Sequence, residues 1–160
     1  GTTFVFYLPV TDQNMIQPDE IVSRPLLQAD SPRSILVVED QPDVRLYACS
    51  VLRTAGYTVY EAESGLKVMD FARIHTDPID LLFTDVVLGG MNGRELAEKF
   101  QLHLPDTRTL FTSGYADDEV ALFGVIQDRI AFLSKPYSPM DLLAKVRSVL
   151  NDLTDPDATE

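Results

Sequence analysis

The distribution of apolar residues divides the chain into a patterned central region and two flanks without a sustained pattern. From Ser34 onward, short apolar runs of strand length alternate with longer segments in which apolar residues recur at helical spacing. The first run, SILVV, is continuous and largely β-branched, as is typical of a strand buried in a parallel sheet. Strands that alternate with helices through short connections favour an open parallel α/β sheet.

The alternation predicts five strands and five helices. Pro42 suits a first helical position and Gly56 a helix end, while Ser138-Pro139 with Asp141 is typical of a capped helix start. The helix expected at 117–127 has the weakest pattern. We expect strands at residues 34–38, 57–62, 80–85, 109–113 and 131–135, and helices at 42–55, 65–74, 93–100, 117–127 and 138–150.

The flanks carry different patterns. Residues 1–10, GTTFVFYLPV, alternate like a strand but have no neighbour in sequence with which to pair, and a lone strand is not stable in water. Residues 11–32 mix Pro, Asp, Gln and Ser and are interpreted as a linker. Residues 33–151 form the expected domain, and residues 152–160 an acidic tail.

The composition of the chain argues against several classes of function. The net charge of -12 and the pI near 4.4 argue against a nucleic-acid or anionic-membrane partner. The single cysteine, Cys49, excludes a disulfide framework and a cysteine-based zinc site. No apolar run approaches the length of a membrane span, and nothing resembles a signal peptide. We therefore expect a cytoplasmic segment that makes no direct membrane contact.

Polar residues that could take part in chemistry lie at the ends of the predicted strands. Glu39 and Asp40 follow the first strand, Asp85 ends the third, Ser113 ends the fourth, and Lys135 ends the fifth. Sites in open α/β sheets lie beyond these carboxyl ends. Each residue alone has an ordinary interpretation as a helix cap or solvated loop residue. Three clustered carboxylates, however, would repel unless a cation neutralised them, and hard oxygen ligands suit Mg²⁺.

Four motifs in order, ILVVED, LLFTDVVLGGMNG, LFTSGY and SKPY, resemble the receiver domains of two-component response regulators over residues 33–151. The resemblance implies a flavodoxin-like, doubly wound five-stranded parallel sheet of order 2-1-3-4-5 with five helices. It also implies that Asp85 is the phosphoacceptor. Glu39, Asp40, Asp85 and the backbone carbonyl of Val87 would then hold Mg²⁺.

The same resemblance implies roles for residues near the last two strands. Ser113 and Lys135 would contact phosphoryl oxygens, and the peptide bond before Pro136 would be cis. Thr112 precedes Ser113, and strand alternation lets only one of them face the site. Ser113 is preferred because Ser-Gly matches the family's hydroxyl-plus-small pair. Ser113 and Phe132 would act as the switch, although Phe132 has an alternative interpretation as an ordinary core or surface residue.

Two other classes share parts of this pattern. A flavodoxin that binds FMN would need a neutral, hydroxyl-rich phosphate loop after the first strand, where Glu39 and Asp40 would repel phosphate. A haloacid-dehalogenase-like phosphatase carries its nucleophile in a DxDxT motif after the first strand. Here the candidate nucleophile follows the third strand, and Asp85-Val86-Val87 lacks the second acid. The phosphatase is kept as the enzymatic alternative.

The opening residues GTTFVFYLPV resemble the last strand of a histidine kinase ATP-binding domain. This resemblance implies that the chain is the receiver of a hybrid sensor histidine kinase, whose parent would be the enzyme and could be membrane-anchored. The receiver would take a phosphoryl group from a phosphohistidine, on a kinase dimerisation domain or a histidine phosphotransfer protein. No basic DNA-binding domain follows residue 151, so output through protein contacts is expected. A stand-alone response regulator is the alternative.

Overall fold

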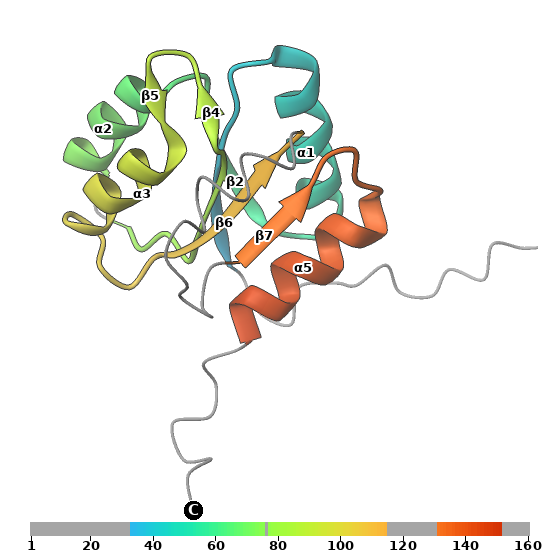
Figure 1. Cartoon of the computed structure of the whole chain (residues 1–160). Coiled ribbons are helices and arrows are strands. Elements are labelled where there is room, and N and C mark those ends of the chain that lie inside the picture. Colours follow the sequence, from blue (N-terminus) through green and yellow to red (C-terminus); the bar gives the residue numbers. More distant parts are fainter. Residues whose placement is uncertain (1–32, 76, 115–130, 152–160) are drawn as a thin grey trace, which may run out of the picture.

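The computed structural model describes residues 33–75, 77–114 and 131–151 (Figure 1). The kinase-like segment 1–10, the linker 11–32, the helix expected at 117–127 and the tail 152–160 lie outside the described residues. Their assignments therefore stay predictions. The domain boundaries that depend on them stay predictions as well.

Five parallel strands form one sheet in the order β2-β1-β3-β6-β7. In chain order these five strands read 2-1-3-4-5, so the predicted fold class and strand order are confirmed. The strands match the predicted segments to within one or two residues. They are β1 (Ser34–Val38), β2 (Thr58–Ala62), β3 (Leu81–Asp85), β6 (Arg108–Ser113) and β7 (Ala131–Ser134).

Four helices cover the two faces of the sheet within the described residues. α1 (Pro42–Thr54) and α5 (Pro139–Asn151) lie on one face, and α2 (Gly65–Ile74) and α3 (Gly93–Gln101) on the other (Figure 1). Side chains alternate between these faces along each strand. The α1/α5 side buries Ile35, Val37, Phe83 and Leu110, and the α2/α3 side buries Leu36, Val38, Leu82 and Phe111.

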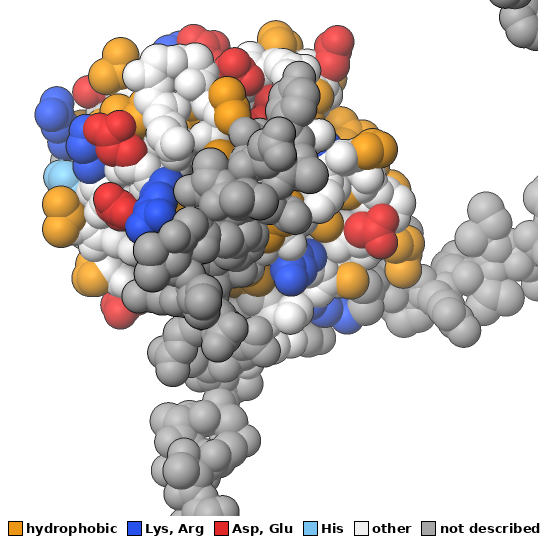
Figure 2. Space-filling model, in the orientation of Figure 1, with side chains coloured by type: hydrophobic (Ala, Val, Ile, Leu, Met, Phe, Trp, Pro, Cys, Tyr) orange, Lys and Arg blue, Asp and Glu red, His pale blue; other side chains and the backbone are white. Residues whose placement is uncertain are grey.

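The predicted helix starts are built as the sequence indicated. Asp141 N donates to Ser138 Oγ, and the Ser138 backbone and hydroxyl both donate to Asp141 Oδ2, which caps α5. Gly56, directly after α1, has a φ of 94°, a conformation that favours glycine. Figure 2 shows acidic and basic side chains interspersed over α2 and α3, where salt bridges join Lys67–Glu63, Arg94–Glu98 and Lys99–Glu95.

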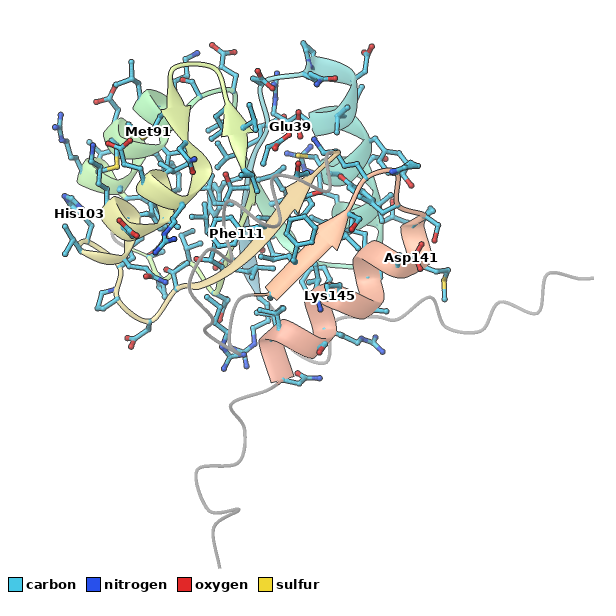
Figure 3. All side chains as sticks on the ribbon, viewed as in Figure 1. Glu39, Met91, His103, Phe111, Asp141 and Lys145 are labelled. Carbon is cyan, nitrogen blue, oxygen red and sulfur yellow. The ribbon has the colours of Figure 1, made fainter. Side chains whose placement is uncertain are left out.

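A short antiparallel hairpin, which the sequence patterns did not predict, joins β3 to α3. Its strands are β4 (Val87–Leu88) and β5 (Met91–Asn92), and Gly90 in the turn has a φ of 92°. Met91, labelled in Figure 3, packs where Gly65 leaves space at the start of α2: a Cβ on Gly65 would lie 2.8 Å from the Met91 sulfur. The hairpin is thereby fixed against the α2/α3 layer.

Two solitary residues have contrasting surroundings. Cys49 is part of α1 and is fully buried in the apolar cluster on the α1/α5 side. His75, at the end of α2, is half-buried, with its ring centroid 4.3 Å from Phe71 and 4.8 Å from Tyr60. No helix in the described part of the chain is long and apolar enough to cross a membrane.

Candidate functional site

Three ionisable side chains meet at the carboxyl edge of the sheet. Glu39 follows β1, Asp85 ends β3, and Lys135 follows β7. The Lys135 ammonium lies 2.6 Å from Glu39 Oε2 and 2.6 Å from Asp85 Oδ2, so one cation bridges two carboxylates. Figure 3 places Glu39 at this edge, close to the end of β6. The convergence follows from topology, because β1 and β3 are neighbours and β7 lies beyond β6.

The two carboxylates are withdrawn from water. Glu39 is 3% exposed and Asp85 7% exposed. Burial raises the pKa of Glu39 and outweighs the opposite effect of Lys135. Burial would lower the pKa of Lys135, but its hydrogen bonds to Asp85 and Glu39 outweigh burial and raise that pKa. The lysine therefore stays charged at neutral pH, and its ammonium is shared between two buried carboxyl groups.

Both oxygens of the Asp85 carboxylate have a fixed partner. The Val87 amide donates to Oδ1 at 2.9 Å, and Lys135 donates to Oδ2 at 2.6 Å. The Val87 amide was not expected to contribute, since the resemblance assigned Val87 only a carbonyl role. Two different donors therefore set the orientation of this carboxylate.

Asp40 stands apart from the ion cluster. Its side chain is exposed, and its Oδ2 would lie 3.7 Å from a Cβ on Gly89, so it lies beside the turn of the β4–β5 hairpin. Among the residues that the structure describes, no three His, Cys, Asp or Glu side chains lie together as a metal site. Lys135 takes the neutralising position between Glu39 and Asp85. The metal-ligand roles of Glu39, Asp40, Asp85 and Val87 stay predictions.

Thr112 and Ser113, at the end of β6, lie at different distances from the carboxyl edge of the sheet. Thr112 is in register with Asp85, whereas Ser113 lies one residue further toward the carboxyl edge and is in register with Ser134. Both side chains are buried, and the Thr112 hydroxyl has no hydrogen-bond partner. The choice of Ser113 as the phosphoryl-binding residue stays a prediction.

The last strand carries two further expected features. The Lys135–Pro136 peptide is cis, as the resemblance implied. Phe132 is half-buried and packs against the apolar cluster on the α2/α3 side. That packing fits a core role and leaves its function as a switch untested.

The contribution of the Val87 amide escaped the sequence reasoning. It depends on the hairpin between β3 and α3. The available signal was the Gly89-Gly90 pair between the apolar residues Leu88 and Met91, since two glycines are typical of a hairpin turn. Strands of two residues are too short to show a period of two.

The model of the response regulator receiver domain family matches residues 35–147. The sensor kinase CckA of Brucella abortus (strain 2308) is 30% identical over 156 residues, which cover 94% of this chain and 16% of that protein. The response regulator receiver protein CpdR of the same strain is 30% identical over 118 residues, covering 74% of this chain and 97% of CpdR.

Solved structures agree with these matches. The receiver domain of the hybrid histidine kinase CckA is 33% identical, with a TM-score of 0.62, and the match covers 73% of this chain and 98% of that domain. A CheY-like receiver domain protein from Methanospirillum hungatei JF-1 is 27% identical, with a TM-score of 0.65 and coverage of 76% and 96%. The chain belongs to the response regulator receiver domain family.

Proposed function

We propose that this receiver accepts a phosphoryl group on Asp85 from a phosphohistidine and thereby switches its protein contacts. The observation that supports the proposal most strongly is the Asp85 carboxylate, which is buried at the carboxyl edge of the sheet. It is held by the Val87 amide on one oxygen and by Lys135 on the other. A buried carboxylate oriented in this way is a preorganised nucleophile.

Phosphoryl transfer needs little from the protein beyond position and charge. An oxygen of Asp85 forms a bond to phosphorus while the bond from phosphorus to the histidine nitrogen breaks. The nitrogen keeps the electron pair and takes up a proton. Lys135 can neutralise the developing charge, because its ammonium already lies 2.6 Å from the attacking carboxylate.

The donor set fits Mg²⁺. The cluster sets two carboxyl groups against one base, and the exposed Asp40 carboxylate lies at the same edge, by the turn of the β4–β5 hairpin. Glu39, Asp40, Asp85 and the Val87 carbonyl would hold the ion, which prefers oxygen ligands. When bound, Mg²⁺ supplies positive charge beside the phosphoryl oxygens.

The switch is proposed to run through Ser113, Lys135 and Phe132. A phosphoryl group on Asp85 adds acceptor oxygens that the Ser113 hydroxyl and Lys135 can contact. Such new contacts would favour a second arrangement of β6 and β7, and with them Phe132. Hydrogen exchange in residues 131–140, with and without beryllofluoride as a phosphoryl mimic, tests this. Unchanged exchange there would contradict the switch.

The parent protein is proposed to be a hybrid sensor histidine kinase whose receiver segment lies in the cytoplasm. A match to the CckA sensor kinase over 94% of the chain must include part of residues 1–34, outside the receiver family match. That supports an origin in a hybrid kinase, because the similarity extends beyond the receiver family match. The phosphodonor would be a kinase dimerisation domain or a histidine phosphotransfer protein. The match covers 97% of CpdR, a response regulator receiver protein. A stand-alone regulator is therefore the second candidate.

Phosphorylation by acetyl phosphate tests the function directly. We expect intact-mass measurements to show one added phosphoryl group on the wild-type chain, only with Mg²⁺, and none on Asp85→Asn. Asp80→Asn is the matched control, because Asp80 is also ion-paired but lies at the opposite end of the sheet. Phosphate on Asp85→Asn would contradict the assignment. Turnover of a phosphomonoester would favour the phosphatase instead.

A further inference from the structure

The start of α3 lies directly against the backbone of Asp85. Gly93 is the first residue of α3, and a Cβ built on it would lie 2.0 Å from the Asp85 carbonyl oxygen and 3.1 Å from Val86 Cα. These are backbone atoms, which cannot rotate away as the end of a flexible side chain can. Gly93 has no positive φ, unlike Gly56 and Gly90. The position therefore requires glycine for space and not for its backbone angles.

The crowded atoms belong to the peptide that orients the Asp85 carboxylate. Gly93 N donates to Val86 O at 2.8 Å, so the first residue of α3 is hydrogen-bonded to that segment. The next amide, that of Val87, donates to Asp85 Oδ1 at 2.9 Å. A shift of the Asp85–Val86 peptide would carry the Val87 amide with it. The Asp85 carboxylate would then lose the hydrogen bond from the Val87 amide and keep the one from Lys135.

We infer that Gly93 is a positioning residue for phosphoryl transfer. By leaving the space over the Asp85 carbonyl free, it lets α3 close against the Asp85–Val86 peptide, and this closure holds the Val87 amide on Oδ1. Oδ2 stays on Lys135, so the two bonds together fix the plane of the nucleophile. The inference rests on the proposed function, since it concerns the same carboxylate.

A purely structural role for Gly93 makes a different prediction. Gly93→Ala would then lower stability without changing the rate of the folded protein. The positioning role predicts a lower maximal phosphorylation rate in the folded protein, because misplacing a reacting group by a fraction of an ångström lowers the rate strongly. The acetyl phosphate concentration at half-maximal rate should change little, since Gly93 does not contact the phosphodonor.

The experiment compares Gly93→Ala with Gly56→Ala. Gly56 has a φ of 94°, and a Cβ placed on it would meet nothing within 4 Å, so alanine there strains the backbone without crowding the site. We expect the maximal rate of Gly93→Ala with Mg²⁺, corrected for the folded fraction, to fall roughly tenfold or more. Gly56→Ala should keep the wild-type rate. The amide proton resonance of Val87 should shift only in Gly93→Ala, because only there is its hydrogen bond displaced.

Equal rates and equal Val87 resonances in folded Gly93→Ala and wild type would overturn this inference alone. A wild-type chain that takes up no phosphate would remove the proposed function, and this inference with it.

Should Gly93→Ala fail to fold, Thr84→Val acts on the same carbonyl without crowding it. The Thr84 hydroxyl donates to Asp85 O at 3.0 Å, and valine keeps its shape. We expect a smaller decrease of the maximal rate, about threefold, together with a shifted Val87 amide. A wild-type rate and an unshifted amide in folded Thr84→Val would overturn the inference.

Discussion

The two ends of the parallel sheet both carry an ion pair, but the charges balance at only one of them. At the amino edge, Arg33 lies 2.7 Å from Asp80, and the backbone amide and hydroxyl of Ser34 donate to the other oxygen of that carboxylate. At the carboxyl edge, Lys135 alone bridges Glu39 and Asp85. One acid pairs with one base at the amino edge, whereas two acids share one base at the carboxyl edge.

The pKa values follow this difference. Burial would raise the pKa of Asp80, but the hydrogen bonds from Ser34 and Arg33 outweigh burial and lower it. For Glu39 burial prevails and the pKa is raised. The amino edge is therefore a satisfied structural pair that stabilises the ionised acid. The carboxyl edge holds two acids against one base and raises the pKa of one of them, which is typical of a functional site.

Removing Lys135 should have the largest effect. Lys135→Met leaves two buried carboxylates without their shared cation, and we expect the free energy of unfolding to fall by about 3 kcal/mol. Mg²⁺ should restore part of this loss. Arg33→Ala is the control at the amino edge, where the half-exposed arginine should cost no more than about 1 kcal/mol. Urea unfolding at neutral pH measures both, and equal losses would contradict the comparison.

Asp80→Asn should have the second-largest effect and should depend on pH. Because the pKa of Asp80 is lowered by folding, its ionised form stabilises the protein above the pKa of an unfolded aspartate. We expect Asp80→Asn to lower the free energy of unfolding by about 1–2 kcal/mol at pH 7.

The difference between Asp80→Asn and wild type should shrink as the pH falls through the folded pKa of Asp80. Urea unfolding at pH 7 and in the acid range checks this. A difference that stays constant with pH would show that Asp80 acts only through its shape and hydrogen bonds.

The sheet and the ion cluster were predictable because they follow from long patterns. Apolar runs gave each strand, and the carboxyl ends of parallel strands must share one edge, so Glu39, Asp85 and Lys135 were expected to meet. The β4–β5 hairpin was not predictable, since two-residue strands show no period. Without the hairpin, neither the Val87 amide nor the space at Gly93 could be placed against Asp85.

The position of Asp40 shows another limit of sequence reasoning. Adjacent residues after a strand were expected to cluster, yet Glu39 is buried and Asp40 exposed, because successive side chains leave the strand on opposite sides. His75 shows the same limit. A polar residue at the end of a helix is usually exposed, but His75 packs in one cluster with the aromatic rings of Tyr60 and Phe71.

Mg²⁺ should stabilise the carboxyl edge only. At ten times its dissociation constant the ion should raise the free energy of unfolding by about 1.4 kcal/mol. Asp40→Ala should remove most of this gain, whereas Asp80→Asn should keep it, since Asp80 lies at the other end of the sheet. Thermal melts with and without Mg²⁺ measure the gain. A melting temperature that does not change with Mg²⁺ would contradict the proposed ligand set.

Glu39→Gln should have the smallest effect, and of opposite sign to the other substitutions. Glutamine keeps an oxygen that accepts from Lys135 but removes one of the two negative charges, so Lys135 and Asp85 are left as a balanced pair like that at the amino edge. Without Mg²⁺ we expect the free energy of unfolding at pH 7 to rise by about 1 kcal/mol. The gain from Mg²⁺ should become smaller than in wild type, because a ligand is lost. Glu61→Gln, which alters a half-exposed acid outside the site, is the control. If Glu39→Gln destabilises the protein without Mg²⁺, the Glu39 carboxylate does not add unfavourable charge to the Lys135–Asp85 pair. The comparison of charge balance between the two edges would then be wrong.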